Sequence, residues 1–156
     1  MRTRVRDATP GDVPGIHELV RQLAVYDREP ELFTASAADL EDAMFGDNAI
    51  LHALVAEGEE GLVGVATWYL RYDTWEGGAT MWLEDLFVAP QARGHNVGGD
   101  LMAELGRRVV DKRLLRLEWT VLKWNEPSIG FYRRFGADIV GEERHTMRWA
   151  PTSGPA

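Results

Sequence analysis

The sequence contains no cysteine. This absence excludes disulfide bonds, zinc sites built on thiolates and a cysteine acyl-enzyme. The four histidines, at positions 17, 52, 95 and 145, show no metal-ligand spacing, so we expect no metal site. No apolar run reaches the length of a membrane span, and the N-terminal residues have a strand-like pattern unlike that of a signal sequence. We therefore expect a cytoplasmic protein with no membrane partner.

Basic residues are few: 17 lysines and arginines stand against 25 aspartates and glutamates, and the net charge is −8. This charge argues against nucleic acid as a partner, because binding to phosphates needs a basic surface. It favours a cationic ligand, although acidic surfaces more often serve solubility. The 156 residues, 45% of them apolar, indicate one globular domain over residues 1–150 with a disordered tail at 151–156.

Helical and strand patterns alternate along the chain. Capping residues followed by apolar positions at helical spacing predict helices at residues 10–26, 37–46, 97–109 and 126–136. Short apolar runs between turn residues predict strands at residues 3–8, 50–57, 62–72, 81–89, 114–122, 139–140 and 146–149. No repeat or linker divides these elements.

One stretch, residues 81–101, combines a strand, a glycine-rich turn and a helix. The strand is apolar apart from Glu84 and Asp85, and it ends at Pro90, which has no N–H for a sheet hydrogen bond. Three glycines and an asparagine then lie within six residues, directly before the helical pattern. The amides of such a turn and the helix N-terminus bind anions. The stretch therefore predicts a phosphate site beside two buried carboxylates.

The order of the predicted elements, βααβββαβαββ, resembles that of the GNAT acetyltransferase superfamily over nearly the whole chain. The phosphate motif of that superfamily, R/Q-x-x-G-x-G/A, corresponds to Arg93–Gly98. Three further runs are similar to the diamine (spermidine/spermine-type) and thialysine acetyltransferase branch: Leu83–Val88, Tyr72–Trp75 and Trp124–Tyr132. A glycine motif alone is weak evidence, but four motifs in order make a specific match.

The resemblance implies an α/β (α+β) fold. A mixed, mostly antiparallel and twisted sheet of six to seven strands would splay between its fourth and fifth strands, with about four helices flanking it. The resemblance also implies a homodimer in which the neighbouring subunit shapes part of the acceptor site.

The cofactor implied by the resemblance is acetyl-CoA, from which the acetyl group passes directly to a primary amine. The main chain of Leu86, Phe87 and Val88 would hold the pantetheine arm like an added strand. The pyrophosphate would bind to the turn formed by Arg93, Gly94, His95, Asn96, Val97, Gly98 and Gly99. Asn125 and Ser128 would flank the arm from the other side.

Two residues match the catalytic positions of the relatives. The amine must lose a proton because an ammonium ion has no lone pair, and Glu84 would accept that proton directly or through water. Tyr132 would give a proton to the departing CoA thiolate. The alternatives are a satisfied structural carboxylate for Glu84 and a packing role for Tyr132. Attack would occur in a ternary complex, because no cysteine exists for an acyl-enzyme.

Acidic and aromatic residues are expected at the acceptor site, because carboxylates and aromatic faces attract cationic amines. The expected set comprises Tyr26, Asp27, Asp73, Trp75, Glu84, Asp85 and Glu118. Asp85 is either a helper of Glu84 or a hydrogen-bonded structural residue. The aromatic residues Trp68, Tyr72 and Trp75 either cage the amine or pack in the core.

Asn96 departs from the family motif, which usually has glycine at this position. Asparagine is the non-glycine residue that best tolerates a left-handed backbone. The turn would therefore survive if a positive φ is the only requirement. Close approach of the pyrophosphate to the Cα atom would instead weaken CoA binding.

The sequence thus predicts an acetyl-CoA-dependent N-acetyltransferase for a small cationic acceptor, such as a diamine, a polyamine or a lysine-like amino acid. Two alternatives stay open. One is a resistance-type enzyme that acetylates an amine-bearing antibiotic or herbicide. The other is a module that binds acyl-CoA without turnover, against which the presence of both Glu84 and Tyr132 argues.

Overall fold

The computed structural model describes residues 1–151, so the predicted disordered tail lies outside the described residues except for Pro151. In chain order, the elements are β1 (Arg4–Asp7), η1 (Pro10–Asp12), α1 (Val13–Tyr26), η2 (Pro30–Leu32), α2 (Ala37–Phe45), β2 (His52–Gly58), β3 (Gly61–Asp73), β4 (Gly78–Val88), η3 (Pro90–Ala92), α3 (Val97–Asp111), β5 (Leu117–Glu118) and α4 (Glu126–Phe135). None of the helices in this part of the chain is long and apolar enough to cross a membrane.

The five strands form one sheet in the order β1-β2-β3-β4-β5. The first four strands pair antiparallel, whereas β5 pairs parallel with β4 and only at Met81 and Trp82. β4 continues to Val88 along β3 but without β5 beside it. The sheet is therefore mixed and mostly antiparallel, as predicted, and it opens between its fourth and fifth strands.

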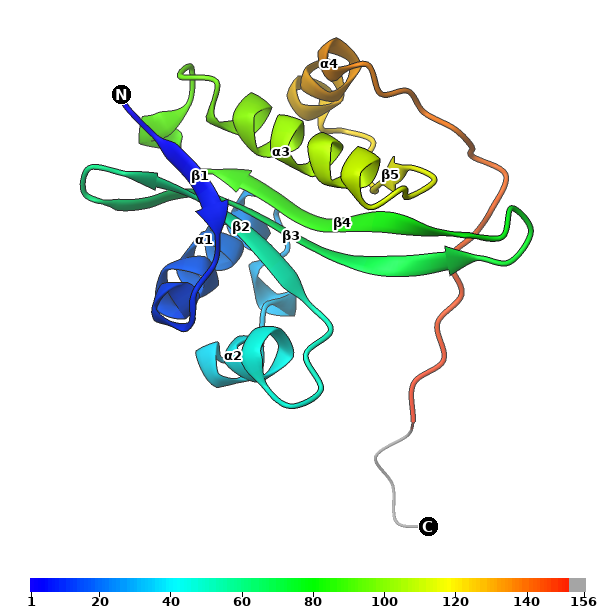
Figure 1. Ribbon diagram of the computed structural model, residues 1–156, viewed down its shortest axis with the longest axis horizontal. Helices are drawn as coiled ribbons and strands as arrows, with labels where there is room; N and C mark the ends of the chain where they lie inside the picture. The colour runs from blue at the N-terminus through cyan, green and yellow to red at the C-terminus, as the bar shows by residue number, and fades with distance from the viewer. Residues whose placement is uncertain (152–156) are drawn as a thin grey trace. The chain divides into compact units, whose positions relative to one another are not determined.

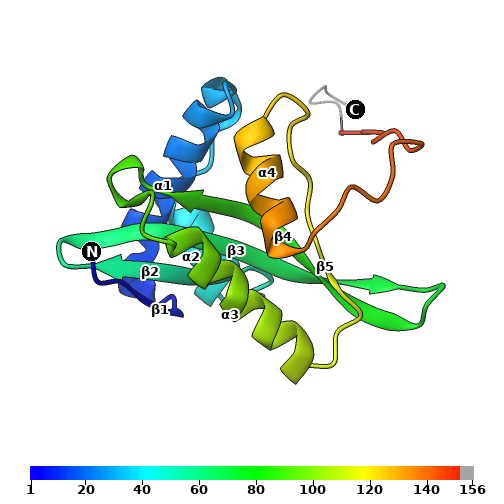
Figure 2. The ribbon, with the colours of Figure 1, turned by 90° about the horizontal axis from the view of Figure 1, so that it is seen from above.

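Helices cover both faces of the sheet. α1 and α2 lie on one face and α3 lies on the other (Figure 1), and a view from above shows α3 crossing the strands (Figure 2). The core under α1 and α2 combines buried residues of the helices, of the strands and of the turn after β4: Val13, Ile16, Leu19, Met44, Ala53, Val55, Val65, Phe87 and Ala89. On the α3 face, a side chain at Gly64 would press on Val97 and Leu101, so α3 packs close to the strand.

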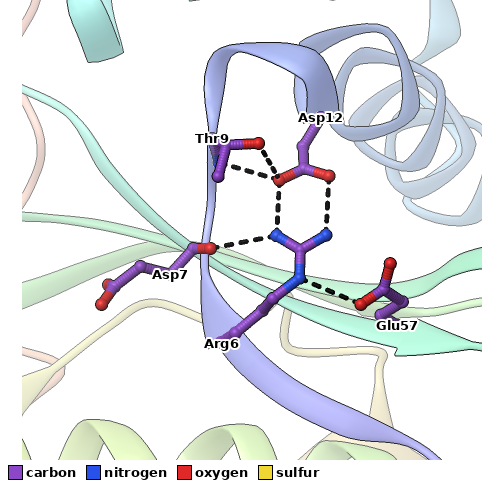
Figure 3. A network of polar contacts seen from close by, with 5 residues as sticks. All are labelled: Arg6, Asp7, Thr9, Asp12 and Glu57. Carbon is purple, nitrogen blue, oxygen red and sulfur yellow. Dashed lines mark hydrogen bonds and ion pairs between the residues drawn. The ribbon is translucent and has the colours of Figure 1, made fainter.

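An ion-pair network fixes the start of α1 (Figure 3). The Arg6 guanidinium donates two hydrogen bonds to the Asp12 carboxylate, at 2.7 and 2.9 Å, and a third to Glu57 on β2, at 3.1 Å. The Thr9 amide also donates to Asp12, at 2.8 Å, at the helix start that the capping residues predict. Arg6 lowers the pKa of Asp12 to about 2.

The sheet has five strands instead of the predicted six to seven. The predicted strand at 114–122 is reduced to Leu117–Glu118, because the chain leaves β4 after that point, and the predicted strands at 139–140 and 146–149 do not form. Apolar side chains of these last segments stay in solvent, with Val140 exposed for 91% and Trp149 for 86%. A β-forming sequence needs a neighbouring strand and burial, and these segments gain no burial.

The chain divides into two compact units, of which Met1–Lys123 contains the sheet and α1 to α3. The second unit, from Trp124 onward, contains α4. The side-chain oxygen of Asn125 accepts a hydrogen bond from the Ser128 amide at 3.3 Å, and Gly136 ends α4 with a φ of 102°. Both ends of α4 agree with the sequence, while the single-domain assignment stays a prediction.

Candidate active site

A β-bulge separates the two acids of β4. On β3, Thr67 lies opposite Asp85 and Trp68 lies opposite Leu83. Glu84 therefore has no residue opposite it on β3. Bulges re-aim side chains and are common near active sites. Glu84 is exposed, and it accepts a hydrogen bond of 3.1 Å from its neighbour Trp82. The expectation that both acids are buried is therefore wrong for Glu84, because the bulge turns it to solvent.

Asp85 is the less exposed, half-buried member of the pair. Its carboxylate accepts a hydrogen bond of 2.5 Å from the hydroxyl of Thr67, whose residue is only 1% exposed. Burial raises the pKa of Asp85 to about 6, and the charges of Glu84 and Asp27 add to the rise, while the Thr67 hydrogen bond opposes it. Asp85 thus gains or loses its proton near physiological pH.

Asp27, directly after α1, completes an acid cluster with Glu84 and Asp85. Burial raises the pKa of Asp27, and the charge of Glu29 adds to this rise. Within residues 1–151, none of the three carboxylates of this acid cluster takes part in a salt bridge. The cluster therefore carries uncompensated negative charge, which suits a cationic ligand.

Arg93 links the phosphate turn to the end of α1. Its Nε donates to the carbonyl of Val88 at 3.1 Å. Its guanidinium carbon also lies 5.3 Å from the ring centre of Tyr26 and 5.6 Å from that of Phe87. The structure thus brings three predicted site residues, Tyr26, Phe87 and Arg93, into one contact group.

The open edge of β4 presents main-chain groups to a ligand. The amide of Ala89 donates to the carbonyl of Val63 on β3, at 2.8 Å. Successive amides of a strand point to opposite edges, so the amide of Phe87 also faces β3. The amides of Leu86 and Val88 then face the edge that β5 leaves uncovered. An extended ligand can add to such an edge as a further strand.

The glycine-rich turn has the backbone that the sequence motif requires. Gly94 has a φ of 81°, and Asn96 adopts the left-handed conformation with φ 61° and ψ 16° directly before α3. Asn96 therefore meets the requirement for positive φ. The side-chain nitrogen Nδ2 of Asn96 donates to the Asp100 carboxylate at 3.1 Å. The same side chain occupies the space that a Cβ atom at Gly99 would need.

The turn is also accessible to an anion. Residues 93–96 are exposed, and the first amides of α3 lack an intrahelical acceptor, as in any helix. His95 lies within this exposed segment, while Val97 is buried and anchors the turn to the core. The positive-φ residues of the turn and the N-terminal amides of α3 fit a pyrophosphate group.

Two predicted acceptor residues have a different partner. The guanidinium of Arg116 contacts Asp73 at 2.6 Å, Glu76 at 2.9 Å and also Glu118, forming a group that we call the arginine clasp. Asp73 further accepts hydrogen bonds from the amides of Trp75 and Glu76, at 2.9 and 3.0 Å. The Glu76 amide and Arg116 lower the pKa of Asp73.

The arginine clasp lies away from the acid cluster. Asp73 pairs with Gly78 at the start of β4, six residues before Glu84, and six strand residues span roughly 20 Å. The hairpin that carries Asp73 extends beyond the other strands (Figures 1 and 2), and Trp75 at its turn is 92% exposed. Within one chain, the structure therefore does not bring Asp73 and Trp75 to Glu84.

The aromatic residues of the hairpin do not form a cage. Trp68 is 2% exposed and stacks on His52 with 4.3 Å between ring centres, whereas Tyr72 and Trp75 are exposed. Trp68 is therefore a core residue, which agrees with the structural alternative. Its indole nitrogen has no hydrogen-bond partner in the described part of the chain.

The remaining predicted residues belong to the second unit. Tyr132 on α4 packs edge-on against Phe131, with 5.3 Å between ring centres. Asn125 and Ser128 form the cap of the same helix. Their roles toward CoA stay predictions.

Comparison with known proteins decides the family. The profile of the Acetyltransferase (GNAT) family matches residues 15–137. The chain belongs to this family. It is similar to the thialysine N-epsilon-acetyltransferase of Sus scrofa, with 33% identity over 155 residues that cover 93% of this chain and 91% of that protein. The GNAT acetyltransferase described here therefore agrees with the branch that its motifs indicate.

One further relative and one solved structure extend the match. The spermidine/spermine N(1)-acetyltransferase-like protein 1 of Homo sapiens is 31% identical over 148 residues, which cover 90% of this chain but 21% of that protein. A solved structure of a possible acetyltransferase from Clostridium difficile 630 superposes with a TM-score of 0.80 at 15% identity, covering 97% of this chain and 100% of that chain. The latter similarity confirms the fold of this GNAT acetyltransferase.

Sequence reasoning missed two residues of these sites, Thr67 and Arg116. Thr67 is a lone polar residue in an apolar strand, and pairing the two predicted strands of the hairpin would have placed it near Asp85. Arg116 stands two residues before Glu118 within the predicted strand at 114–122, which is the spacing of neighbours on the same face of a strand. No group of three or more histidine or acidic side chains among residues 1–151 is arranged to hold a metal.

Proposed function

We propose that this protein transfers the acetyl group of acetyl-CoA to a primary amine of a small cationic acceptor, by direct attack in a ternary complex. A diamine, a polyamine or a lysine-like amino acid is the proposed acceptor. The observation that carries the proposal is the acid cluster of Asp27, Glu84 and Asp85, which adjoins the open edge of β4 and forms no salt bridge with the residues that the structure describes. The names of the relatives, which mention thialysine and spermidine/spermine, support the same acceptor class.

The proposed cofactor site follows the open edge and the turn. The amides of Leu86 and Val88 would bind the pantetheine arm, as a neighbouring strand would. The turn from Arg93 to Gly99, with two residues in positive φ and the N-terminus of α3, would bind the pyrophosphate. In this proposal Asn125 and Ser128 contribute from α4.

The proposed chemistry needs a proton acceptor and a proton donor. A carboxylate of the acid cluster takes a proton from the acceptor ammonium, so that the nitrogen lone pair can attack the acetyl carbonyl carbon. Tyr132 is the proposed donor to the leaving thiolate. Tyr26 and Asp27 border the acceptor site from the end of α1. A homodimer is also part of this proposal, as the resemblance implies.

The test is thiol release from acetyl-CoA across a panel of amines. Matched pairs of equal chain length, such as 1,5-diaminopentane and pentylamine, isolate the contribution of the second ammonium group. We expect release with diamines or lysine-like amino acids and little with the monoamines. Release only with an amine-bearing antibiotic would favour a resistance-type enzyme, and CoA binding without release from any amine would favour a binding module.

A further inference from the structure

Thr67 and Asp85 form a bonded pair at the bulge of β4. The pair spans β3 and β4, and its hydrogen bond of 2.5 Å joins the Thr67 hydroxyl to one oxygen of the carboxylate, Oδ2. Among residues 1–151, Oδ1 has no hydrogen-bond partner. One oxygen is thus fixed by the fold, and the other is left for a ligand.

Asp85 lies on the part of β4 that β5 leaves uncovered, and on the face of the sheet that α1 covers. Side chains alternate along a strand, so Asp85 points to the same face as Phe87 and Ala89, whose side chains pack in the core with α1. Asp85 lies one residue before Leu86, whose amide faces the open edge. Glu84, in contrast, is exposed and bonded to Trp82.

We propose that Asp85, and not Glu84, takes the proton of the acceptor ammonium, and that Thr67 is the residue that positions it. The inference rests on the proposed function above. Thr67 is buried beneath Asp85 and acts only through it, by restricting the carboxylate to one orientation and leaving its free oxygen for the amine. Glu84 then serves as a nearby charge that attracts the cation.

The proposed step balances in atoms and protons. The acceptor R–NH3+ gives one proton to the Asp85 carboxylate, and the resulting R–NH2 attacks the acetyl carbonyl carbon. A C–N bond forms, the C–S bond breaks and CoA leaves as a thiolate. The second proton of the attacking nitrogen reaches the thiolate through Tyr132, in the role proposed above. Asp85 returns its proton to solvent, so that one proton is released for each acetyl transfer.

The groups that act on the pKa of Asp85 come from three elements. Glu84 is its neighbour on β4, Asp27 faces it from the end of α1, and Thr67 contributes a neutral donor from β3. The nearest described guanidinium of the turn after β4 is that of Arg93, which lies over Tyr26 and Phe87. The two negative neighbours thus raise the pKa of the Asp85 carboxyl group, and the hydrogen-bond donor lowers it.

These opposed effects predict shifts of the acid limb in the pH profile of kcat/KM. Activity requires ionised Asp85, so it falls as the pH drops through the pKa of Asp85, about 6. Thr67→Val removes a donor that stabilises the carboxylate, so we expect the limb to move up by roughly one pH unit. Such a shift lowers kcat/KM about five-fold at pH 6. Asp27→Asn removes a negative neighbour and is expected to move the limb down.

The experiment measures thiol release from acetyl-CoA with 1,5-diaminopentane between pH 5 and 9, for wild type and four variants. Thr67→Ser is the matched control, because it keeps the hydroxyl and should restore the wild-type limb. Glu84→Gln should lower kcat/KM and, like Asp27→Asn, move the limb down, because it also removes a negative neighbour of Asp85. If Thr67 had only a structural role, Thr67→Val would lower kcat/KM by the same factor at every pH.

The outcomes separate this inference from the proposed function. An upward shift in Thr67→Val, its absence in Thr67→Ser and a downward shift in Asp27→Asn support the inference. If wild type releases thiol but the limb stays in place in Thr67→Val, or disappears in Glu84→Gln, the inference is overturned while the proposed function stands. If wild type releases no thiol with any amine, the proposed function fails and the inference fails with it.

Discussion

The acid cluster and the arginine clasp each gather three carboxylates along the hairpin of β3 and β4, yet they have opposite electrostatic surroundings. In the clasp, a single guanidinium bonds Asp73, Glu76 and Glu118. In the cluster, Asp27, Glu84 and Asp85 have no such partner in the described chain, and burial raises the pKa of two of them. A carboxylate with a fixed cation is a structural element, whereas one without a cation can receive an ammonium ion.

This contrast has a cost in stability. The pKa of Asp73 is lowered in the folded protein, so its ionised form stabilises the fold above its ordinary pKa of 3.8. The pKa of Asp85 is raised to about 6, so its ionised form opposes folding near neutral pH. Destabilised charges of this kind are common where a protein keeps a group ready for chemistry.

The largest expected effect is on the rate. Asp85→Asn keeps the size of the side chain and an oxygen that can accept the Thr67 hydrogen bond, but it cannot take a proton. We expect kcat/KM for 1,5-diaminopentane to fall by roughly 10²- to 10⁴-fold. Asp73→Asn, which removes the same charge from the clasp, is the matched control and should stay near wild type. Equal losses in both variants would remove the distinction between the two regions.

The same substitution should raise stability at neutral pH. Because the folded pKa of about 6 exceeds the ordinary value of 3.8, the native state binds more protons between these values, and stability falls as the pH rises through that window. Above pH 6 the deficit persists, and Asp85→Asn removes it. We expect the free energy of unfolding to increase by roughly 1–3 kcal/mol at pH 7 and to change little at pH 4. Denaturant unfolding at both pH values measures this, and a less stable variant at pH 7 would contradict it.

Removing the cation from the clasp should lower stability and leave activity unchanged, which is the reverse of the effects expected for Asp85→Asn. Arg116→Gln leaves three carboxylates without their partner, so we expect Tm to fall by a few degrees while kcat/KM stays close to the wild-type value. The loss should shrink at high salt, because ions screen the repulsion among partly exposed carboxylates. Calorimetric melting at low and high salt provides the measurement. An activity loss as large as that of Asp85→Asn would assign the clasp to the active site.

Local sequence signals predicted much of this fold. The capping boxes at Thr9 and Ser36 correspond to helix starts in the structure, and the glycine-rich turn leads into α3 as expected. The left-handed backbone of Asn96 agrees with the glycine that the family motif usually has at this position, and asparagine tolerates this conformation. Each of these features depends on a few adjacent residues, and therefore each is readable from one sequence.

Features that depend on two distant segments were not predicted. The bulge at Glu84 arises from the register between β3 and β4, so the pattern of β4 alone suggested two buried acids. Arg116 joins Asp73 across 43 positions of sequence, and no local pattern reveals that pairing. The predicted strands at 139–140 and 146–149 have the right composition, but their apolar side chains remain exposed.

The most direct test of the acid cluster as the acceptor site is calorimetry of diamine binding at pH 6. Enzyme saturated with CoA, which carries no acetyl group, is titrated with 1,5-diaminopentane in two buffers of different ionisation enthalpy. At this pH Asp85 is about half protonated, so binding of the ammonium group should release roughly half a proton per site. The measured heat should then depend on the buffer for wild type and for Asp73→Asn, but not for Asp85→Asn. A buffer-independent heat in wild type, with unchanged diamine affinity in Asp85→Asn, would contradict the account.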